Sequence, residues 1–457
     1  MKKIALIGTG PSNVFLALKL IKKGFDGQID IFEKGNSLTV RDRKEVCEGF
    51  AGAGCFSDSK LSVGLLVGNI IPGLTQEEFD KYIDEMLEIY NTFKKQISDP
   101  SEIVLKEDGV FETGVEGMEW LHHKTNHIGT DNGVQIFLKM EEFLKSQPNV
   151  TMHFNVDVLD VLRVGEGSKM NFEGAEIDMH NLVNKYALYC ENRISGNQES
   201  SGFYDAVIVG TGQRGILPNR LIAKFNLETV NRPFQLGIRV EDTRNETYDK
   251  MIAANYDFKV VKNYTFPNGI KGRVRTFCCN SGIPAISVED NGGMFKSYNG
   301  HAFRNGEKTN LVNYGIICEL TGYDKFTTKE EQFQLCKDVN NHEGFDKDNV
   351  IGVGRPLLED FCSGDKIKNA CIEDIYPEYT KAALKDFISN LNKFCDLSKA
   401  HYYYPEAKFD GKTVKYSPYF ETSQKNLFII GDACCTRGIA KSAYTGLKVA
   451  DYLLGLI

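Results

Sequence analysis

The segment KKIALIGTGPSNVFLALKLIKKG, residues 2–24, constrains the fold more than any other part of the sequence. Four apolar residues at positions 4–7, followed by Gly8, predict a short buried strand. The apolar spacing after the glycines predicts an amphipathic helix that ends at Gly24. GQIDIFEKG, residues 27–35, then reads as a second strand. Strand, glycine turn, helix and strand in this order predict a βαβ unit within a parallel sheet.

The first turn of this unit has the residues that a dinucleotide needs. Gly8 permits a tight turn, and Gly10 lets the backbone approach a pyrophosphate at the helix N-terminus. Three further residues complete the expected phosphate loop: Pro11, Ser12 and Asn13. Glu33 is placed to accept hydrogen bonds from both hydroxyls of an adenosine ribose and would repel a phosphorylated ribose. Because Asn13 stands where the pattern has its third glycine, an ordinary glycine turn remains the alternative.

A second stretch near the end of the sequence matches the far half of such a ligand. NLFII predicts another strand of the same sheet, and Asp432 at its carboxyl end is placed to accept hydrogen bonds from ribityl hydroxyls of a flavin. The helix that follows begins with small residues, so its first-turn N–H groups can face the pyrimidine edge of the ring. The residues expected at this seat are Gly431, Asp432, Gly438, Ile439 and Ala440. A Gly/Ala helix packed on a neighbouring helix is the structural alternative.

GFYDAVIVGTGQRG, residues 202–215, predicts a buried strand followed by a glycine loop. We interpret it as the strand by which the chain returns to the nucleotide domain, so Gly210, Thr211 and Gly212 would border the cofactor. A second dinucleotide fold for NAD(P)H is the alternative. We favour the return strand because no matching helix with an acidic residue about 20 positions later follows.

Composition limits the class of protein. The chain has 457 residues, which favours two domains, and 42% apolar and 25% charged residues are typical of a globular protein. A formal charge of −8 without a basic cluster argues against nucleic acid. Twelve cysteines without CxxC spacing indicate reduced thiols, and no apolar run is long enough for a membrane span. We therefore expect a cytoplasmic protein without a metal site.

Several motifs together resemble the uncharacterised FAD-dependent dehydrogenases, a branch of the glutathione reductase-like and geranylgeranyl reductase-like flavoproteins. They are IGTGPSN, EGFAGAGCFSDSKLSVG, NHIGTDNG, PFQLGIRVED, TFCCNSGIPAISVEDNGGMFKSYNGHAFRNGEKTN and IIGDACCTRGIAKSAYTG. The resemblance covers almost the whole chain and implies that the cofactor is FAD. The chain departs from the family at Asn13, at the QRGIL that follows Gly212, and at Asn280 and Ser281, which replace a cysteine and a proline.

The glycine-rich loop GFAGAGCFSDSK can lie against a flat ring or a phosphate, because its glycines have no Cβ. The resemblance implies that this loop approaches the flavin, with Lys60 near N5 or N1; a solvated surface lysine is the alternative. Lys34 and Arg41, or Arg43, follow Glu33 closely enough to reach the cofactor, and the Val158 backbone is placed to bracket the adenine. The loop residues expected to contact the cofactor are Gly52, Ala53, Gly54, Ser57 and Lys60.

Three residues are candidates for catalysis: Lys60, His127 and His301. His127 can line the active site or be a hydrogen-bonded core histidine, and Thr130 or Asp131 beside it is a good helix N-cap. His301 and Arg304 lie on a glycine-bounded loop that suits an anionic substrate, although such loops are often only turns. For the adjacent Cys278 and Cys279, buried thiols are favoured over a vicinal redox pair.

These features predict an α/β protein with a Rossmann-like FAD-binding domain of the glutathione reductase type and an interleaved α+β substrate or cap domain. We expect the FAD-binding domain at residues 1–62, 125–216 and 402–457, and the substrate domain at 63–124 and 217–401. The expected activity is hydride transfer between flavin N5 and a small organic substrate, with an unknown electron donor or acceptor. The alternatives are an NAD(P)H-dependent flavin reductase of a C=C bond and a non-catalytic flavin carrier.

Overall fold

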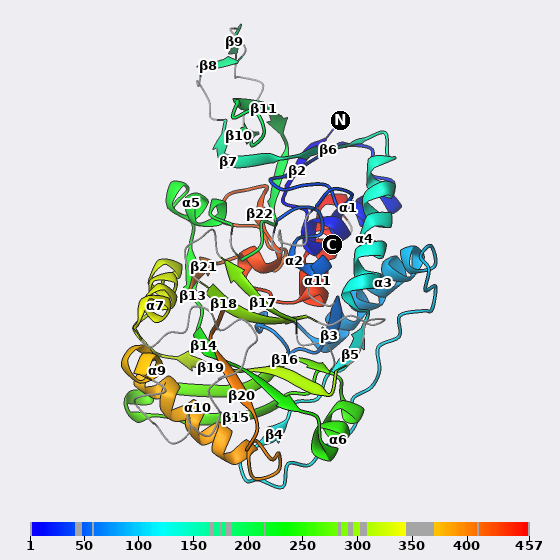
Figure 1. Cartoon of the computed structure of the whole chain (residues 1–457). Coiled ribbons are helices and arrows are strands. Elements are labelled where there is room, and N and C mark those ends of the chain that lie inside the picture. Colours follow the sequence, from blue (N-terminus) through cyan, green and yellow to red (C-terminus); the bar gives the residue numbers. More distant parts are fainter. Residues whose placement is uncertain are drawn as a thin grey trace. The chain divides into compact units, whose positions relative to one another are not determined.

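The computed structural model (Figure 1) describes residues 2–41, 48–56, 59–164, 169–172, 175–178, 185–213, 215–281, 285–290, 296–301, 309–343, 370–408 and 411–455. The chain folds into two compact units, and each unit is assembled from separate stretches. Unit 1 comprises Met1–Val104, Asn132–Val230 and Thr413–Ile457, and unit 2 comprises Leu105–Asp131 and Asn231–Lys412.

A five-stranded parallel sheet forms the centre of unit 1, in the order β22-β12-β1-β2-β6. Its strands are β1 (Lys3–Ile7), β2 (Gln28–Glu33), β6 (Val150–Phe154), β12 (Ala206–Val209) and β22 (Leu427–Ile429). β12 pairs with β1 on one side and with β22 on the other. The prediction of a return strand in the first sheet is therefore confirmed, and so is the prediction that NLFII belongs to it.

The βαβ unit forms where the sequence predicts it. Gly8 adopts φ 86°, a left-handed conformation that favours glycine, and α1 (Pro11–Lys22) starts with a proline at its first position. α1 packs against α11 (Ile439–Leu454) at Gly446, where a Cβ would lie 1.9 Å from the Ser12 carbonyl oxygen. The close approach of these two helices therefore requires glycine at position 446.

Further helices and strands surround this sheet within unit 1. α3 (Gln76–Lys94) buries the apolar stripe that its spacing predicts, including Phe79, Ile83 and Met86. A three-stranded antiparallel sheet has the order β11-β10-β7. The remaining bounds are α2 (Gly52–Phe56), β3 (Lys60–Val63), α4 (Thr130–Lys145), β7 (Val156–Arg163), β8 (Lys169–Phe172), β9 (Ala175–Asp178), β10 (Tyr186–Asn192), β11 (Gln198–Tyr204), α5 (Leu217–Lys224) and η3 (Gly431–Cys434).

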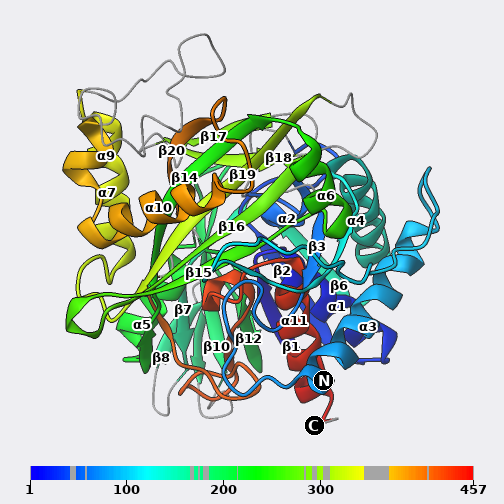
Figure 2. The same cartoon turned by 90° about the horizontal axis from the view of Figure 1, so that it is seen from below.

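Unit 2 contains a six-stranded antiparallel sheet in the order β20-β14-β19-β16-β15-β4, and α10 (Glu378–Leu391) lies across one of its faces (Figure 2). Its strands are β4 (Glu119–Trp120), β14 (Phe234–Thr243), β15 (Val260–Thr265), β16 (Lys271–Ser281), β19 (Leu311–Thr321) and β20 (His401–Lys408). The other bounds are β5 (Lys124–His127), β13 (Thr229–Asn231), α6 (Glu246–Ala254), η2 (Pro267–Gly269), β17 (Ala285–Asp290), β18 (Lys296–His301), α7 (Lys329–Asn341), α9 (Ala370–Ile375) and β21 (Lys412–Val414).

The compact units divide the chain differently from the expected domains, whose bounds remain a prediction. Residues 63–104 belong to unit 1, where Tyr82 of α3 donates a hydrogen bond to Asp451 of α11. Residues 402–412 belong to unit 2, because β20 pairs with β14 in the antiparallel sheet. Residues 125–131 also belong to unit 2, and 217–230 to unit 1.

Two kinds of feature are absent from the described part of the chain. None of its helices combines the length and apolarity needed to cross a membrane. Within the same residues, His, Cys, Asp and Glu side chains form no group of three or more that could hold a metal ion.

Candidate functional site

Loops from distant parts of the sequence meet at the carboxyl edge of the parallel sheet in unit 1. A Cβ on Gly8 would lie 2.7 Å from the Gly210 carbonyl oxygen, and one on Gly431 would lie 2.6 Å from Ser12 Oγ. A Cβ on Gly54 would lie 2.7 Å from Pro11 Cγ. The β1–α1 turn, α2, the loop after β12 and the loop after β22 therefore approach one another closely. Such an edge is where open α/β sheets bind their ligands.

Two glycines at the same edge have free space beside their backbone. Gly212 and Gly438 have φ +70° and +91°, and, their chain neighbours aside, no heavy atom of the described residues lies within 4 Å of a Cβ built on either one. Gly438 is the N-cap of α11 and provides no side-chain cap. The first N–H groups of α11, at Ile439 and Ala440, consequently lack intrahelical acceptors and have the partial positive charge of a helix N-terminus.

Three buried oxygen atoms on these loops have no hydrogen-bond partner within the part of the chain that the structure describes. They are Asn13 Oδ1, Thr211 Oγ1 and Thr436 Oγ1. Asn13 and Thr436 are each only 1% exposed. An unsatisfied buried polar group costs about 1–3 kcal/mol. Thr211 and Thr436 follow β12 and β22, so their two hydroxyls indicate that a polar ligand completes this edge, whereas Asn13 lines a gap beneath the turn.

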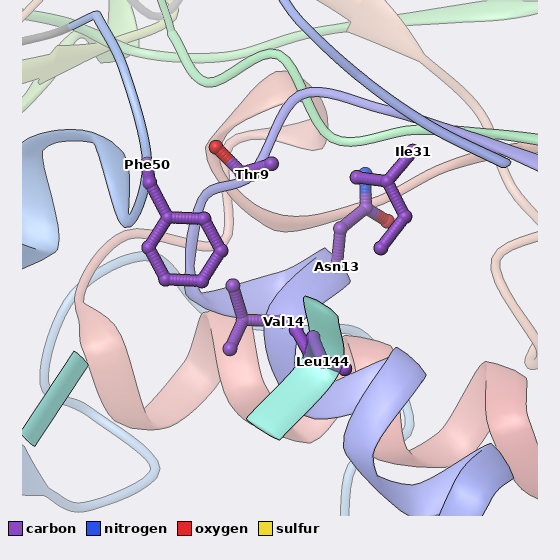
Figure 3. Close-up of a pocket in the computed structure, with 6 residues that line it drawn as sticks. All are labelled: Thr9, Asn13, Val14, Ile31, Phe50 and Leu144. Carbon is purple, nitrogen blue, oxygen red and sulfur yellow. The ribbon is translucent and has the colours of Figure 1, made fainter. Parts of the chain in front are cut away.

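Asn13 explains how the turn tolerates the missing third glycine. Its Nδ2 donates hydrogen bonds to the carbonyl oxygens of Ile7, at 3.0 Å, and Gly8, at 2.8 Å. Asn13 lines a small pocket with Thr9, Val14, Ile31, Phe50 and Leu144 (Figure 3). This pocket has no room for a water molecule, whereas a typical ligand pocket has a volume of roughly 300–1,000 Å³. We therefore interpret this pocket as a packing gap beneath the turn.

Glu33 lies at the expected edge, but the chain itself surrounds its carboxylate with donors. Oε2 accepts hydrogen bonds from Thr9 N, at 3.0 Å, and Thr9 Oγ1, at 2.6 Å. Oε1 accepts from the backbone N–H groups of Gly35 and Gly49, each at 2.9 Å. A carboxylate has about four acceptor positions. A ribose hydroxyl that binds Glu33 must therefore displace one of these donors, and ribose binding by Glu33 remains a prediction.

Asp432 follows β22 at the same edge as Glu33, which is the last residue of β2. Three strand spacings of about 4.8 Å separate β2 from β22, so the two residues are roughly 14 Å apart along the edge. The Arg437 guanidinium lies 3.7 Å from Asp432 Oδ2 and also donates to Gln213 Oε1. Arg437 therefore links the loop after β22 to the loop after β12.

Lys34 and Arg41, which were expected to reach the cofactor, form an ion pair and a hydrogen bond with other residues of the chain. Lys34 pairs with Glu48, which also pairs with Arg193 at 2.8 Å. Burial alone would raise the pKa of Glu48, but hydrogen bonds from these two cations lower it overall. Arg41 is buried and donates to the Phe50 carbonyl oxygen at 2.6 Å. These contacts hold the segment after β2 in place, and phosphate binding by Lys34 and Arg41 remains a prediction.

The remaining residues predicted to contact the cofactor differ in how buried they are. Gly52 adopts φ +51° with the Gly10 Cα 3.5 Å from its built Cβ, whereas Ala53 is exposed. Val158 is buried in β7. Ser57 and Arg43 lie outside the described residues.

The three candidate catalytic residues are divided between the units. Lys60 begins β3 in unit 1 and is partly buried. In unit 2, the His127 ring stacks on Tyr256 with centroids 4.4 Å apart. His301 ends β18, and Arg304 lies outside the described residues. The catalytic roles of Lys60, His127 and His301 remain predictions.

The described cysteines are free thiols, which include both adjacent pairs. Cys279, Cys434 and Cys435 are buried, whereas Cys278 is half-buried. Cys279 Sγ donates to the Phe258 carbonyl oxygen at 3.0 Å. The prediction of buried thiols is therefore confirmed for Cys279, Cys434 and Cys435, whereas Cys278 is only half-buried.

The structure adds residues to the site that the sequence does not single out. Lys441, in the first turn of α11, donates to the carbonyl oxygens of Leu65 and Asn69. Asn69 Nδ2 in turn donates to the Cys435 carbonyl oxygen at 2.8 Å. The segment at residues 65–69 thus supports the loop that contains Thr436. In the sequence, Thr436 and Arg437 could have been singled out only by their position between Asp432 and Gly438.

Comparison with known proteins gives no family. No protein-family model and no curated protein matches the chain. Similar solved structures include CtdE in complex with FAD and a substrate, at 10% identity over 98% of this chain and 79% of that chain, with a TM-score of 0.41. Glycine oxidase from Geobacillus kaustophilus has 12% identity over 100% and 95% of the two chains, with a TM-score of 0.41. The tetracycline destructase Tet(51) has 11% identity over 100% and 83%, with a TM-score of 0.38. Such values assign neither a fold nor an activity.

Proposed function

We propose that unit 1 binds FAD and that the protein is an FAD-dependent oxidoreductase acting on a small organic molecule. The observation that supports this proposal is a pair of buried hydroxyl oxygens at the glycine-lined edge, Thr211 Oγ1 and Thr436 Oγ1, which have no hydrogen-bond partner among the described residues. The edge suits an extended dinucleotide, because the residues after β2 and β22 lie roughly 14 Å apart along it. When bound, FAD would supply the hydride chemistry, with transfer between flavin N5 and the substrate.

The residues of unit 1 have distinct parts in this proposal. The backbone of the β1–α1 turn, at Gly10, Pro11 and Ser12, would hold the pyrophosphate at the start of α1. The free N–H groups at the start of α11 would stabilise negative charge on the pyrimidine edge. Asp432 would accept hydrogen bonds from the sugar-alcohol chain, and Thr436 would contribute its buried hydroxyl.

Substitution of Thr436 by valine tests the proposal with two readouts. Thr436→Val keeps the shape and removes an unsatisfied hydroxyl, so the FAD-free protein should unfold at the same or a higher temperature. FAD affinity, measured by calorimetry, should fall about tenfold, because a hydrogen bond of about 1.4 kcal/mol is lost.

Thr422→Val is the matched control in the same unit. The Thr422 hydroxyl donates to the Gln424 carbonyl oxygen at 3.2 Å and accepts from Gln424 N at 3.1 Å. This variant should lose stability and keep its FAD affinity. A purified protein that is colourless and cannot be reconstituted with FAD would refute the proposal. Lowered stability with unchanged FAD affinity in Thr436→Val would show instead that this hydroxyl is structural.

The kind of oxidoreductase is a separate question that the reconstituted protein can answer. Under anaerobic conditions, loss of the flavin absorbance near about 450 nm on addition of NADH or NADPH would support reduction of an organic substrate. Loss of colour with a candidate metabolite would support a dehydrogenase. No bleaching with any donor would support a flavin carrier.

A further inference from the structure

The sheet of unit 2 has two very different faces. Side chains alternate along β14, and Leu236, Ile238 and Val240 join the apolar core with residues of α6 and α10. The opposite face carries Gln235, Arg239 and Glu241, which are 0%, 0% and 3% exposed. Covered sheet faces are ordinarily apolar, since buried polar groups cost free energy unless they are paired. A buried and strongly polar face therefore needs a specific explanation.

Arg239 organises this face. Its Nε and Nη2 bind the two carboxylate oxygens of Glu406, each at 2.8 Å. Its Nη1 donates to the Cys278 carbonyl oxygen at 3.0 Å and to Asn313 Oδ1 at 2.9 Å. Burial alone would lower the pKa of Arg239, but the Glu406 carboxylate raises it overall. The guanidinium is thus a fixed, charged support for its neighbours.

The contact with Arg239 fixes the orientation of the Asn313 amide. A guanidinium only donates, so the atom of Asn313 that faces it must be the oxygen. The nitrogen, Nδ2, is then directed elsewhere on this face. Asn313 is 2% exposed, and Nδ2 finds no acceptor in the residues that the structure describes. A buried donor of this kind indicates an acceptor supplied by a ligand.

The backbone beside Asn313 is irregular and held on both sides. The register of β16 against β19 shifts between Phe277 and Asn280, and Cys278 adopts φ +50°. Arg239 binds the carbonyl of Cys278, and Asp257 Oδ1 accepts from Cys279 N at 3.0 Å. β-bulges redirect side chains and occur next to active sites. A left-handed residue that is not glycine costs about 1–2 kcal/mol, which these contacts offset.

Positive charges surround an aromatic ring on the same face. Lys408 Nζ lies 4.3 Å from the centroid of the Phe277 ring, and the guanidinium carbons of Arg239 and Arg275 lie 5.8 and 6.0 Å from it. A Cβ on Gly315 would lie 2.4 Å from the ring, so a glycine is required beneath it.

Two carboxylates oppose these three cations. They are Glu406, which Arg239 binds, and Glu241, which is opposite Asn313 in the strand register and accepts from Tyr403 OH at 3.5 Å. An anion that accepts a hydrogen bond from Asn313 Nδ2 would therefore lie on a face that carries cations, and a carboxylate is an acceptor of this kind.

We propose that this polar face binds the carboxylate of a small organic acid and that Asn313 Nδ2 donates to it directly. Arg239 acts as the positioning residue that fixes the amide, and Arg275 and Lys408 supply attractive charge. The identification of this acid as the substrate rests on the proposed oxidoreductase function. The proposal that a carboxylate binds here does not rest on that function, because every residue of the site belongs to unit 2.

Thermal unfolding of the whole chain with sodium salts of acetate, glycolate, pyruvate and benzoate tests the proposal. The neutral amides of these acids and equal concentrations of sodium chloride are the controls. At least one acid should raise the unfolding temperature by about 2–6 °C at concentrations well above its dissociation constant. The amides and the chloride should not.

Asn313→Asp identifies the donor. It keeps the oxygen that binds Arg239 and converts the unpartnered donor into an acceptor, so the shift produced by the acid should disappear, with affinity lowered at least tenfold. Asn245→Asp is the matched control, because the Asn245 side chain caps α6 away from this face and aspartate is an equally good cap. It should retain the full shift. FAD retention, measured by absorbance, should be the same in both variants and the parent.

Three results would overturn the proposal. In the first, sodium chloride produces the same shift as the acids, which would be an ionic-strength effect only. In the second, Asn313→Asp retains the shift. In the third, none of the four acids raises the unfolding temperature of the parent protein. Loss of FAD binding in the parent would count against the proposed function but not against the carboxylate site.

Discussion

Lys19 of α1 offers the sharpest test of how the cofactor edge is supported. Its side chain is 2% exposed, and its Nζ lies 2.6 Å from Glu85 of α3 and 2.8 Å from Asp451 of α11. Tyr82 OH donates to the other oxygen of Asp451 at 2.9 Å. One buried ammonium group thus joins α1, α3 and α11, and two of these helices, α1 and α11, begin at the proposed FAD site.

Substitution of Lys19 by methionine should be strongly destabilising. The methionine fills similar space but leaves the Asp451 carboxylate, whose side chain is 6% exposed, without its cation. Loss of one partner of a buried ion pair costs about 3–5 kcal/mol. For a unit of this size, about 2–4 °C per kcal/mol gives a fall in unfolding temperature of roughly 6–20 °C. Calorimetry and urea denaturation followed by circular dichroism would measure both quantities.

Lys22→Met is the matched control, one turn along the same helix. Lys22 pairs with Glu88 at 2.7 Å, but their side chains are 43% and 65% exposed. An exposed pair contributes less than about 1 kcal/mol. Addition of Asp451→Asn to Lys19→Met should restore part of the stability, since it removes the buried charge. Equal losses in the two single variants would refute the reasoning.

Two further predictions concern titratable groups. Burial lowers the pKa of His153, which stacks on Phe32 with centroids 4.7 Å apart, despite the opposing charge of Asp30. The neutral ring stabilises the fold fully above the unfolded pKa of about 6.5, and this stabilisation is lost as the pH falls toward the lowered folded pKa. Between a pH of about 7.5 and 5.5, the free energy of unfolding in urea should therefore fall less in His153→Phe than in the parent. An equal fall in the two proteins would contradict this. Burial also raises the pKa of the Cys55 thiol to about 12, whereas Cys278 is half-buried. Iodoacetamide should modify Cys278 well before Cys55 in the folded protein, as peptide mass spectrometry would show, and the reverse order would contradict the described burial.

The local parts of the fold could be predicted from the sequence. Gly8 and Gly10 between two apolar strands indicate the βαβ unit, and the apolar spacing of residues 79–93 indicates α3. The spacing shows that α3 buries one face but not which neighbour covers it. That neighbour is α11, contacted through residues more than 360 positions away, so the compact unit that contains α3 differs from the expected domain.

The electrostatic details could not be predicted, because they depend on pairs far apart in the sequence. Glu33 is where the motif places it, but its donors Thr9 and Gly49 are 24 and 16 residues away. Arg239 and Glu406 are 167 residues apart. Neither a propensity nor a periodicity connects such pairs. The unpartnered Thr436 hydroxyl likewise depends on what surrounds it in three dimensions.

The strand order of the parallel sheet also has a consequence for biosynthesis. β12 lies between β1 and β22, so its second hydrogen-bonded neighbour emerges from the ribosome more than 200 residues after it. Five of the six strands of the antiparallel sheet in unit 2, all except β4, are synthesised within that interval. During this interval the nascent chain has β12 with one unpaired edge, while unit 2 can already fold. An unpaired strand edge is prone to pair with other chains. Chaperone protection during this interval would matter more for this protein than its final stability suggests.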